Sequence, residues 1–409
     1  MPPISLRSRW PGRYATYWFI LVLLTWLAPV LGQAQDSTLT RLVRQNQWAL
    51  VPQGAQFGGP GWEKLRAAVQ QSQLVLLGEE HGLAQVPPFA AAVAQVLQPA
   101  VFAAEIDPYV AQALTRLAAQ PGPPTAYLRQ YPEALCFYDL AEEFDLVRTL
   151  RAQQTRLIGL DQVFATTAAP FYAQLASLVK NRAAKTYLQQ RAAAYQAQDQ
   201  AYAQLGHDDW VLLKQSQSSV DSLLLLTRHE SAAAQQMAQD YAASYRIYKT
   251  GSHPARLQLM KQNLLRELPP GQPLPKMLFK FGAYHAARGL SPAPFGEFYD
   301  VGNFAQNLAD AQGQKTLHLL IVGKQGAQAI GSSAYFPATN VHAYTAADKA
   351  KYQAFFQQTT GPAWSVTDLH PARHALTANK LQVSEVLRRI LLGYDYLVVI
   401  PETTASRVL

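Results

Sequence analysis

The sequence contains almost no cysteine. Cys136 is the one thiol in 409 residues, so the chain cannot form an internal disulfide. It stands in "EALCFYDL", among apolar and aromatic residues. Because buried free cysteines usually serve packing, this context favours a core residue over a nucleophile.

The chain also lacks the motifs of several functional classes. It has no G-x-S-x-G, so a serine nucleophile elbow is not supported. Neither G-x-G-x-x-G nor a P-loop follows the first predicted strand, so nucleotide binding is not indicated. The formal net charge is +8, but the basic residues are scattered and form no stripe. We therefore expect no contact with nucleic acid.

Long hydrophobic runs are absent except near the amino terminus, where residues 17–31 read "YWFILVLLTWLAPVL". This run is shorter than the roughly 20 residues of a membrane helix, and Pro29 interrupts it. Arginines precede it and small residues follow it, which predicts a secretory signal over residues 1–34, cleaved after Ala34. The protein is then periplasmic or extracellular. An uncleaved anchor is the alternative, and it would be the chain's one contact with a membrane.

Six short apolar runs, each bounded by polar residues, Gly or Pro, predict buried strands in a chain that is 49% hydrophobic. They are residues 74–78, 100–105, 156–161, 276–282, 317–323 and 394–401. Helical patterns fall between them, which predicts an α/β fold with a mostly parallel sheet covered by helices on both faces. Residues 324–380 are expected to form loops with short helices.

One segment breaks this alternation. Residues 166–270 are rich in Ala, Gln, Leu and Tyr and contain no convincing strand, so they predict a lid-like helical insertion within a single α/β domain of residues 35–409. Tyr241, Tyr245 and Tyr248 share one helical face. Such spacing usually marks a buried face, so we interpret them as a packing stripe rather than as ligand contacts.

Acidic residues and histidines follow four of the predicted strands. They are Glu79, Glu80 and His81 after the first strand, Glu105 at the end of the second, Asp161 at the end of the third and His285 after the fourth. In an open parallel sheet, ligands bind at the carboxyl ends of the strands, so we expect a site there. Gly78 and Gly282 each precede a histidine by three residues, and a glycine at that position leaves room for a ligand.

At these residues the sequence resembles the superfamily that joins erythromycin esterases, ChaN-like haem-binding lipoproteins and TraB/Tiki proteases. The matching elements are "LLGEEHG", "AAEIDPY", "LIGLD", "KFGAYHAARGL" and the ending "GYDYLVVIPETTAS". The resemblance covers most of residues 70–165 and 275–405. It implies an α/β core with acidic residues after the early strands. Esterases have three residues between the glycine and the first histidine, whereas this chain has two, so macrolide hydrolysis is not carried over.

The resemblance implies that His81 is the base that deprotonates water, with supporting roles for Glu79, Glu105 and His285. A histidine near its usual pKa of about 6.5 accepts a proton at neutral pH. A carboxylate would orient His81, and His285 would protonate the leaving group or stabilise an oxyanion. This predicts an exported hydrolase acting on an ester- or amide-type bond of a small molecule. The candidate substrate contacts are Glu80, Asp161, Tyr284 and Arg288.

Two alternatives remain open. In the first, His81, Glu105 and His285 bind a divalent metal that activates water. In the second, the protein binds haem or a metal without turnover, like ChaN, and Tyr284 beside His285 contributes. The pattern does not identify a cofactor, and a divalent metal and haem are the two candidates. The pair His370 and His374 in "HPARH" lacks the glutamate of H-E-x-x-H, so zinc is not favoured there.

Overall fold

The computed structural model describes residues 38–206, 210–268, 270–331, 339–344 and 349–409. The predicted signal, residues 1–34, lies outside this part of the chain. Within the described residues, no helix combines the length and the apolar character needed to cross a membrane.

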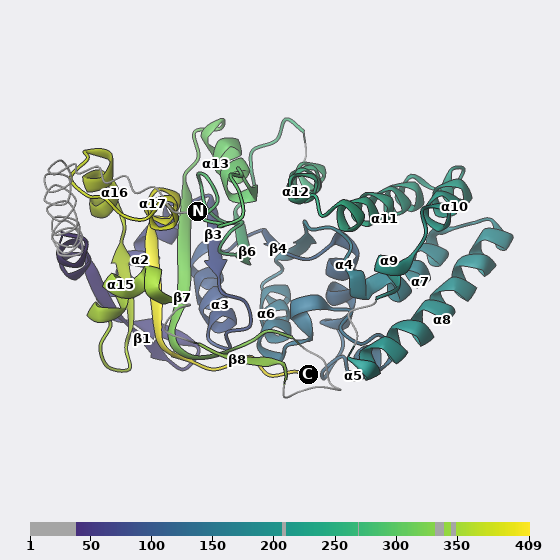
Figure 1. Cartoon of the computed structure of the whole chain (residues 1–409), viewed down its shortest axis with the longest axis horizontal. Coiled ribbons are helices and arrows are strands. Elements are labelled where there is room, and N and C mark those ends of the chain that lie inside the picture. The colour runs from purple at the N-terminus through teal and green to yellow at the C-terminus, as the bar shows by residue number, and fades with distance from the viewer. Residues whose placement is uncertain (1–37, 207–209, 269, 332–338, 345–348) are drawn as a thin grey trace, which may run out of the picture.

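A ten-stranded sheet lies at the centre of the described structure (Figure 1). Its strands are β1 (Gln47–Gln53), β2 (Gln56–Gly58), β3 (Leu74–Glu79), β4 (Val101–Ala104), β5 (Arg156–Gly159), β6 (Met277–Gly282), β7 (Thr316–Ala329), β8 (Val341–Ala343), β9 (Trp364–Asp368) and β10 (Tyr396–Thr403). The order is β2-β1-β9-β10-β7-β3-β6-β4-β5, with β8 paired to β7. The run from β10 to β5 is parallel, and β9 and β1 extend it antiparallel.

Helices cover both faces of the sheet, as the alternation of strands and helices predicts. They are α2 (Pro60–Gln70), α3 (Val86–Leu97), α4 (Pro108–Leu117), α5 (Thr125–Gln130), α6 (Ala141–Ala152), α13 (Val301–Asp310), α15 (Gln353–Gln358), α16 (His370–Thr377) and α17 (Glu385–Gly393). Successive side chains of a strand point to opposite faces. Val75 and Leu77 accordingly pack with α2, α3 and α6, whereas Leu74 and Leu76 pack with α13, α15 and α17. The predicted fold class is confirmed.

All six predicted strands are present, but the expectation of loops in residues 324–380 is partly wrong. There, β7 continues to Ala329, and β8 and β9 pair antiparallel with β7 and β10. The sequence pattern hides these strands because β8 is short and β7 continues in the polar stretch "KQGAQA". Strands β1 and β2, which are largely exposed, were not predicted either.

In their described part, residues 166–270 form helices joined by short linkers and contain no strand, and most of these helices extend away from the sheet on the side of β4 (Figure 1). The elements are η2 (Ala165–Thr167), α7 (Ala168–Leu178), α8 (Arg182–Leu205), α9 (Val211–Lys214), α10 (Gln217–Thr227), α11 (Ala232–Thr250) and α12 (His253–Glu267). Most of these helices share a hydrophobic core separate from that of the sheet. Tyr241 and Tyr245 are buried in it and Tyr248 packs against it, which confirms the packing interpretation.

Candidate functional site

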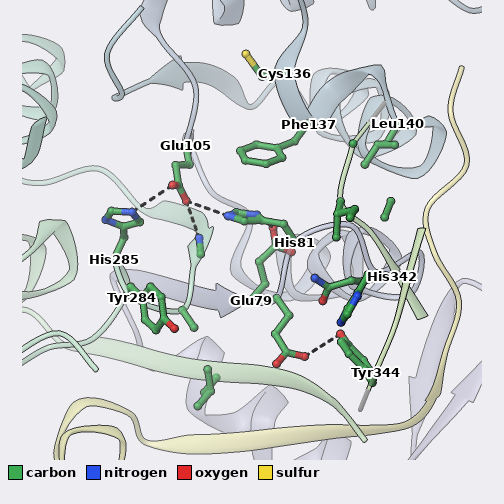
Figure 2. Close-up of a pocket in the computed structure, with 18 of the residues that line it drawn as sticks. Glu79, His81, Glu105, Cys136, Phe137, Leu140, Tyr284, His285, His342 and Tyr344 are labelled. Carbon is green, nitrogen blue, oxygen red and sulfur yellow. Dashed lines mark hydrogen bonds and ion pairs between the residues drawn. The ribbon is translucent and has the colours of Figure 1, made fainter. Parts of the chain in front are cut away.

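A cavity of about 650 Å³ opens at the carboxyl ends of the parallel strands, where the sheet rule places a site (Figure 2). Residues that follow β3, β4 and β6 form one part of its wall. The far end of β7, β8 and the segment from Lys349 to Tyr352 form another. Glu79, Glu80, His81, Glu105, Tyr284 and His285 all line it. Residues widely separated in the sequence therefore meet in one hollow.

His81 lies between two carboxylates. Its Nδ1 is 2.9 Å from Oε1 of Glu79, and its Nε2 is 3.4 Å from Oε2 of Glu105. The ring of Phe137 stacks on the imidazole, with centroids 4.2 Å apart and planes tilted by 13°. The His81 side chain is 30% exposed, whereas both glutamates are buried. His81 is therefore oriented from two sides and still accessible from the cavity.

The glycine of the second G-x-x-H motif makes room for the histidine of the first. A Cβ on Gly282 would lie 2.8 Å from Nε2 of His81, closer than real contacts allow. The backbone N–H of Gly282 also donates to Oε2 of Glu105 at 2.7 Å. Because β3 and β6 are adjacent parallel strands, with Glu79 in register with Gly282, their two motifs meet at one edge.

Glu105 links both histidines of the cavity. Its Oε1 accepts a hydrogen bond from Nη2 of Arg256 at 3.0 Å and lies 3.2 Å from Nε2 of His285. Nδ1 of His285 lies 2.9 Å from Oδ2 of Asp300, the N-cap residue of α13. Figure 2 shows Glu105 between the two imidazoles. Carboxylates thus face both ring nitrogens of His81 and of His285.

These contacts raise the pKa of both histidines. Burial lowers the pKa of His81, but the hydrogen bonds with Glu105 and Glu79 outweigh burial and raise it to about 9. Burial likewise lowers the pKa of His285, and the charge of Glu105 together with the Asp300 hydrogen bond raises it to about 10. Burial raises the pKa of Glu105, but the charge of His285 holds it well below its usual range.

Both imidazoles are therefore protonated at neutral pH in the unliganded site. This differs from the pKa near 6.5 on which the sequence argument relied. The difference arises because the sequence does not show that the two histidines share Glu105.

A buried lysine under the site was missed by the sequence analysis. Nζ of Lys280 lies 2.6 Å from Oε1 of Glu79 and 2.7 Å from Oε1 of Glu143, and all three side chains are buried. Burial lowers the pKa of Lys280, but the two carboxylates raise it above its usual value. The charged residue inside the apolar strand "KMLFKFG" was the available signal, since a lysine is rarely fully buried unless it is paired.

Among the candidate substrate contacts, Glu80 and Tyr284 line the cavity, but Glu80 is also part of its wall. Both oxygens of Glu80 lie 2.6 Å from Nζ of Lys349, and Oε2 accepts from the Tyr344 hydroxyl at 3.0 Å. Asp161 does not line the cavity. It accepts two hydrogen bonds from Arg256 and so supports the residue that contacts Glu105.

The fourth candidate contact, Arg288, lies in a different cluster, where it donates to Asp395. Asp395 precedes β10, and Asp368 ends the antiparallel strand β9 opposite it. His370 bridges these two carboxylates, with Nδ1 2.6 Å from Asp368 and Nε2 3.3 Å from Asp395. This cluster lies at the amino ends of the parallel strands, at the edge of the sheet opposite the cavity.

The ring nitrogens of His81 and His285, in the cavity, face carboxylates. In the described part of the chain, no three His, Cys, Asp or Glu side chains converge in an arrangement suited to a metal ion. The reason in the cavity is geometric, because the imidazole nitrogens that would donate to a metal point at carboxylates instead. Binding would require His81 or His285 to break one of these contacts.

Comparisons with solved structures identify the fold. A Bacillus cereus protein superposes with a TM-score of 0.57 and 15% identity, covering 91% of this chain and 99% of that one. A succinoglycan biosynthesis protein gives 0.56 and 13%, covering 92% and 99%. The erythromycin esterase EreC, as a histidine-to-asparagine variant in its open conformation, gives 0.52 and 14%, covering 84% and 94%. The chain has the fold of an erythromycin esterase.

The relationship rests on the fold rather than on the sequence. No protein-family model and no curated protein matches the chain significantly in sequence. ChaN of Campylobacter jejuni, described with cofacial haem, matches with a TM-score of 0.31 over 68% of this chain. A similarity that low supports no statement about haem. The likeness to the solved structures is therefore one of fold.

Proposed function

We propose that the protein is an exported hydrolase that cleaves an ester- or amide-type bond with water activated by His81. The observation that carries this proposal is the position of His81, which two carboxylates orient at the wall of a 650 Å³ cavity. A shared fold with an erythromycin esterase supports hydrolysis as the reaction class. The pattern of residues 1–34 supports export.

His81 acts in its neutral form. Glu79 accepts the proton on Nδ1. Nε2 then exchanges its contact with Oε2 of Glu105 for one with water and takes a proton from that water. With a pKa of about 9, roughly one imidazole in a hundred is neutral at pH 7, so activity rises with pH in this range. The imidazolium that forms is stabilised by Glu79 and Glu105 on its two sides.

His285 serves the other half of the reaction. It is a buried cation whose Nε2 contacts Oε1 of Glu105, whereas His81 contacts Oε2. Its Nδ1 contacts Asp300. The water oxygen bonds to the acyl carbon and its proton passes to His81, while a proton from His285 goes to the leaving alcohol or amine as its bond to carbon breaks. Glu105 contacts both imidazoles. One carboxylate therefore faces both the histidine that gains a proton and the histidine that loses one.

A panel of ester, lactone and peptide substrates, assayed with and without EDTA, tests the proposal. We expect turnover that survives EDTA and is lost in His81→Asn. His370→Asn is the matched control, because His370 also bridges two carboxylates but lies outside the cavity.

Loss of activity with EDTA and its recovery with Zn²⁺ or Mn²⁺ would replace this mechanism with a metal-dependent one. Full activity in His81→Asn would show that the reaction takes place outside the cavity. Binding of haem or a metal without any turnover, abolished by His285→Ala, would establish a binding protein instead.

A further inference from the structure

A cluster of aromatic rings lies next to the cavity, on the side of His285. Residues 283–300, which connect β6 to α13, contribute Tyr284, Phe295 and Phe298. His253, in the first turn of α12, completes it. The His253 ring lies 4.7 Å from that of Phe298 and 5.3 Å from that of Phe295, and Phe295 lies 5.9 Å from Tyr284. We call these four side chains the aromatic platform.

The platform holds an exposed ring in a fixed orientation. Phe295 meets His253 and Tyr284 at interplanar angles of 88° and 85°, so neighbouring rings contact it edge to face. Phe295 is nevertheless 59% exposed and Tyr284 is 36% exposed. Exposed apolar side chains that gather at a cavity, rather than lying scattered, are typical of a ligand-binding surface.

The platform is continuous with the catalytic end of the cavity. Tyr284 lines the cavity, and the His253 ring lies 5.9 Å from that of His285. Figure 2 shows Tyr284 beside His285 at one end, with His342 and Tyr344 at the other. A molecule whose reacting bond lies at His81 and His285 can therefore extend over Tyr284 towards Phe295.

The chemistry of the platform selects an uncharged, apolar group. Burial, followed by the positive charge of His285, lowers the pKa of His253, so this imidazole is neutral at neutral pH. The two acidic residues of the same loop are both paired, Glu297 with Arg389 and Asp300 with His285. The exposed surface of the platform is thus aromatic, which favours contact with another ring or a saturated cyclic group.

We propose that the aromatic platform binds an apolar, ring-bearing leaving alcohol of the ester substrate. This inference rests on the proposed function, because it is His285, the proton donor to the leaving group, that adjoins the platform. His81 lies on the other side of Glu105, so the acyl part of the substrate lies away from the platform.

Three matched esters test this assignment. Ethyl acetate is compared with cyclohexylmethyl acetate, which enlarges the alcohol, and with ethyl cyclohexylacetate, which enlarges the acyl group. We expect kcat/KM to be about tenfold higher for cyclohexylmethyl acetate than for ethyl acetate, the scale of one good ring contact, and no such gain for ethyl cyclohexylacetate. Phe295→Ala should remove most of the gain.

Tyr299→Ala is the matched control. Tyr299 lies on the same loop and is 58% exposed, about as much as Phe295, but it makes no ring contact with the platform in the described structure. Its variant should retain the preference for cyclohexylmethyl acetate. Phe295→Leu, which keeps an apolar side chain without the ring, distinguishes ring contact from simple burial, and a thermal melt confirms folding of each variant.

A preference for ethyl cyclohexylacetate, or equal loss in Phe295→Ala and Tyr299→Ala, would overturn the assignment while leaving the hydrolase proposal intact. If the wild type hydrolyses no ester, binding of cyclohexylmethanol is followed by NMR. Binding to the wild type but not to Phe295→Ala would support the platform and overturn ester hydrolysis as the reaction. No binding would overturn both.

Discussion

Two histidines in this protein each lie between two carboxylates but have different surroundings. His81 lies between Glu79 and Glu105, and His370 lies between Asp368 and Asp395. The pKa of each is raised to about 9, for His370 mainly by the Asp368 hydrogen bond. His81 lines the cavity under a stacked Phe137, whereas His370 begins α16 at the opposite edge of the sheet.

A histidine between two carboxylates lies at each edge of the sheet, but His81 lines the cavity and His370 does not. In a parallel sheet, the carboxyl ends of the strands are where crossing loops leave a crevice. At the amino ends, the same chemistry holds α16 and β10 together through Asp395, which Arg288 and Arg373 also contact. Under the proposed function, position in the sheet, rather than the pair itself, separates the reactive histidine from the structural one.

The largest expected effect is on turnover. His81→Asn should lower kcat/KM by about 10²-fold or more on any substrate the wild type cleaves, the scale of a lost general base. His370→Asn should change kcat/KM less than about twofold, because His370 lies outside the cavity. Steady-state kinetics on purified variants measures both. Comparable losses in the two variants would show that His81 and His370 do not differ in their contribution to turnover.

His81 and His285 should fail as a unit. Because Glu105 joins them, the double variant His81→Asn/His285→Asn should be hardly less active than His81→Asn alone. A double-variant cycle on kcat/KM measures this coupling. Fully additive losses would indicate that the two imidazoles serve separate steps.

The next effect concerns the lysine under His81. Lys280→Met leaves Glu79 and Glu143 buried without their cation, and breaking a buried pair in this way costs about 3–5 kcal/mol in the free energy of unfolding. Denaturant titration measures the loss. Lys280→Met should also lower kcat/KM, because Glu79 loses its positioning partner. Adding Glu143→Leu should restore much of the stability but not kcat/KM, because Glu79 still lacks that partner. Recovery of both would show that Lys280 serves folding alone.

The pH profile offers a smaller but more specific effect. If neutral His81 is the base, kcat/KM should rise with pH along a limb centred near 9. Glu105→Gln should move this limb to lower pH, since it removes a hydrogen bond that raises the pKa of His81. A profile that is unchanged by Glu105→Gln would contradict the assignment of the limb to His81.

The smallest expected effect is on stability at His370. Its folded pKa of about 9 exceeds the usual 6.5, so its contribution is fully present below pH 6.5 and is lost as pH rises through 9. The side chain is 44% exposed, so solvent limits this contribution to under about 1 kcal/mol. In urea titrations between pH 6 and 10, His370→Asn should flatten this decline in the free energy of unfolding. An unchanged slope would show that groups other than His370 cause the decline in the free energy of unfolding.

Much of the fold was predictable from local pattern. The apolar runs of β3, β4 and β6 are buried on both faces, so burial itself appears as continuous hydrophobicity in the sequence. Short antiparallel strands such as β9 and β8 carry no such signal, because their pairing depends on distant neighbours. β9, "WSVTD", forms only because β10 and β1 lie on its two sides.

The sequence by itself determined which chemical groups reach the functional edge of the sheet. Glu79, His81, Glu105 and His285 each follow a recognisable strand, and parallel strands bring such positions together regardless of loop length. Tertiary structure alone decided their charge and their partners. Lys280, Arg256 and Asp300 reach the site from β6, α12 and the start of α13, and no local pattern encodes these contacts. Because pKa depends on burial and on charges within a few ångströms, protonation of the site followed from the fold rather than from residue types.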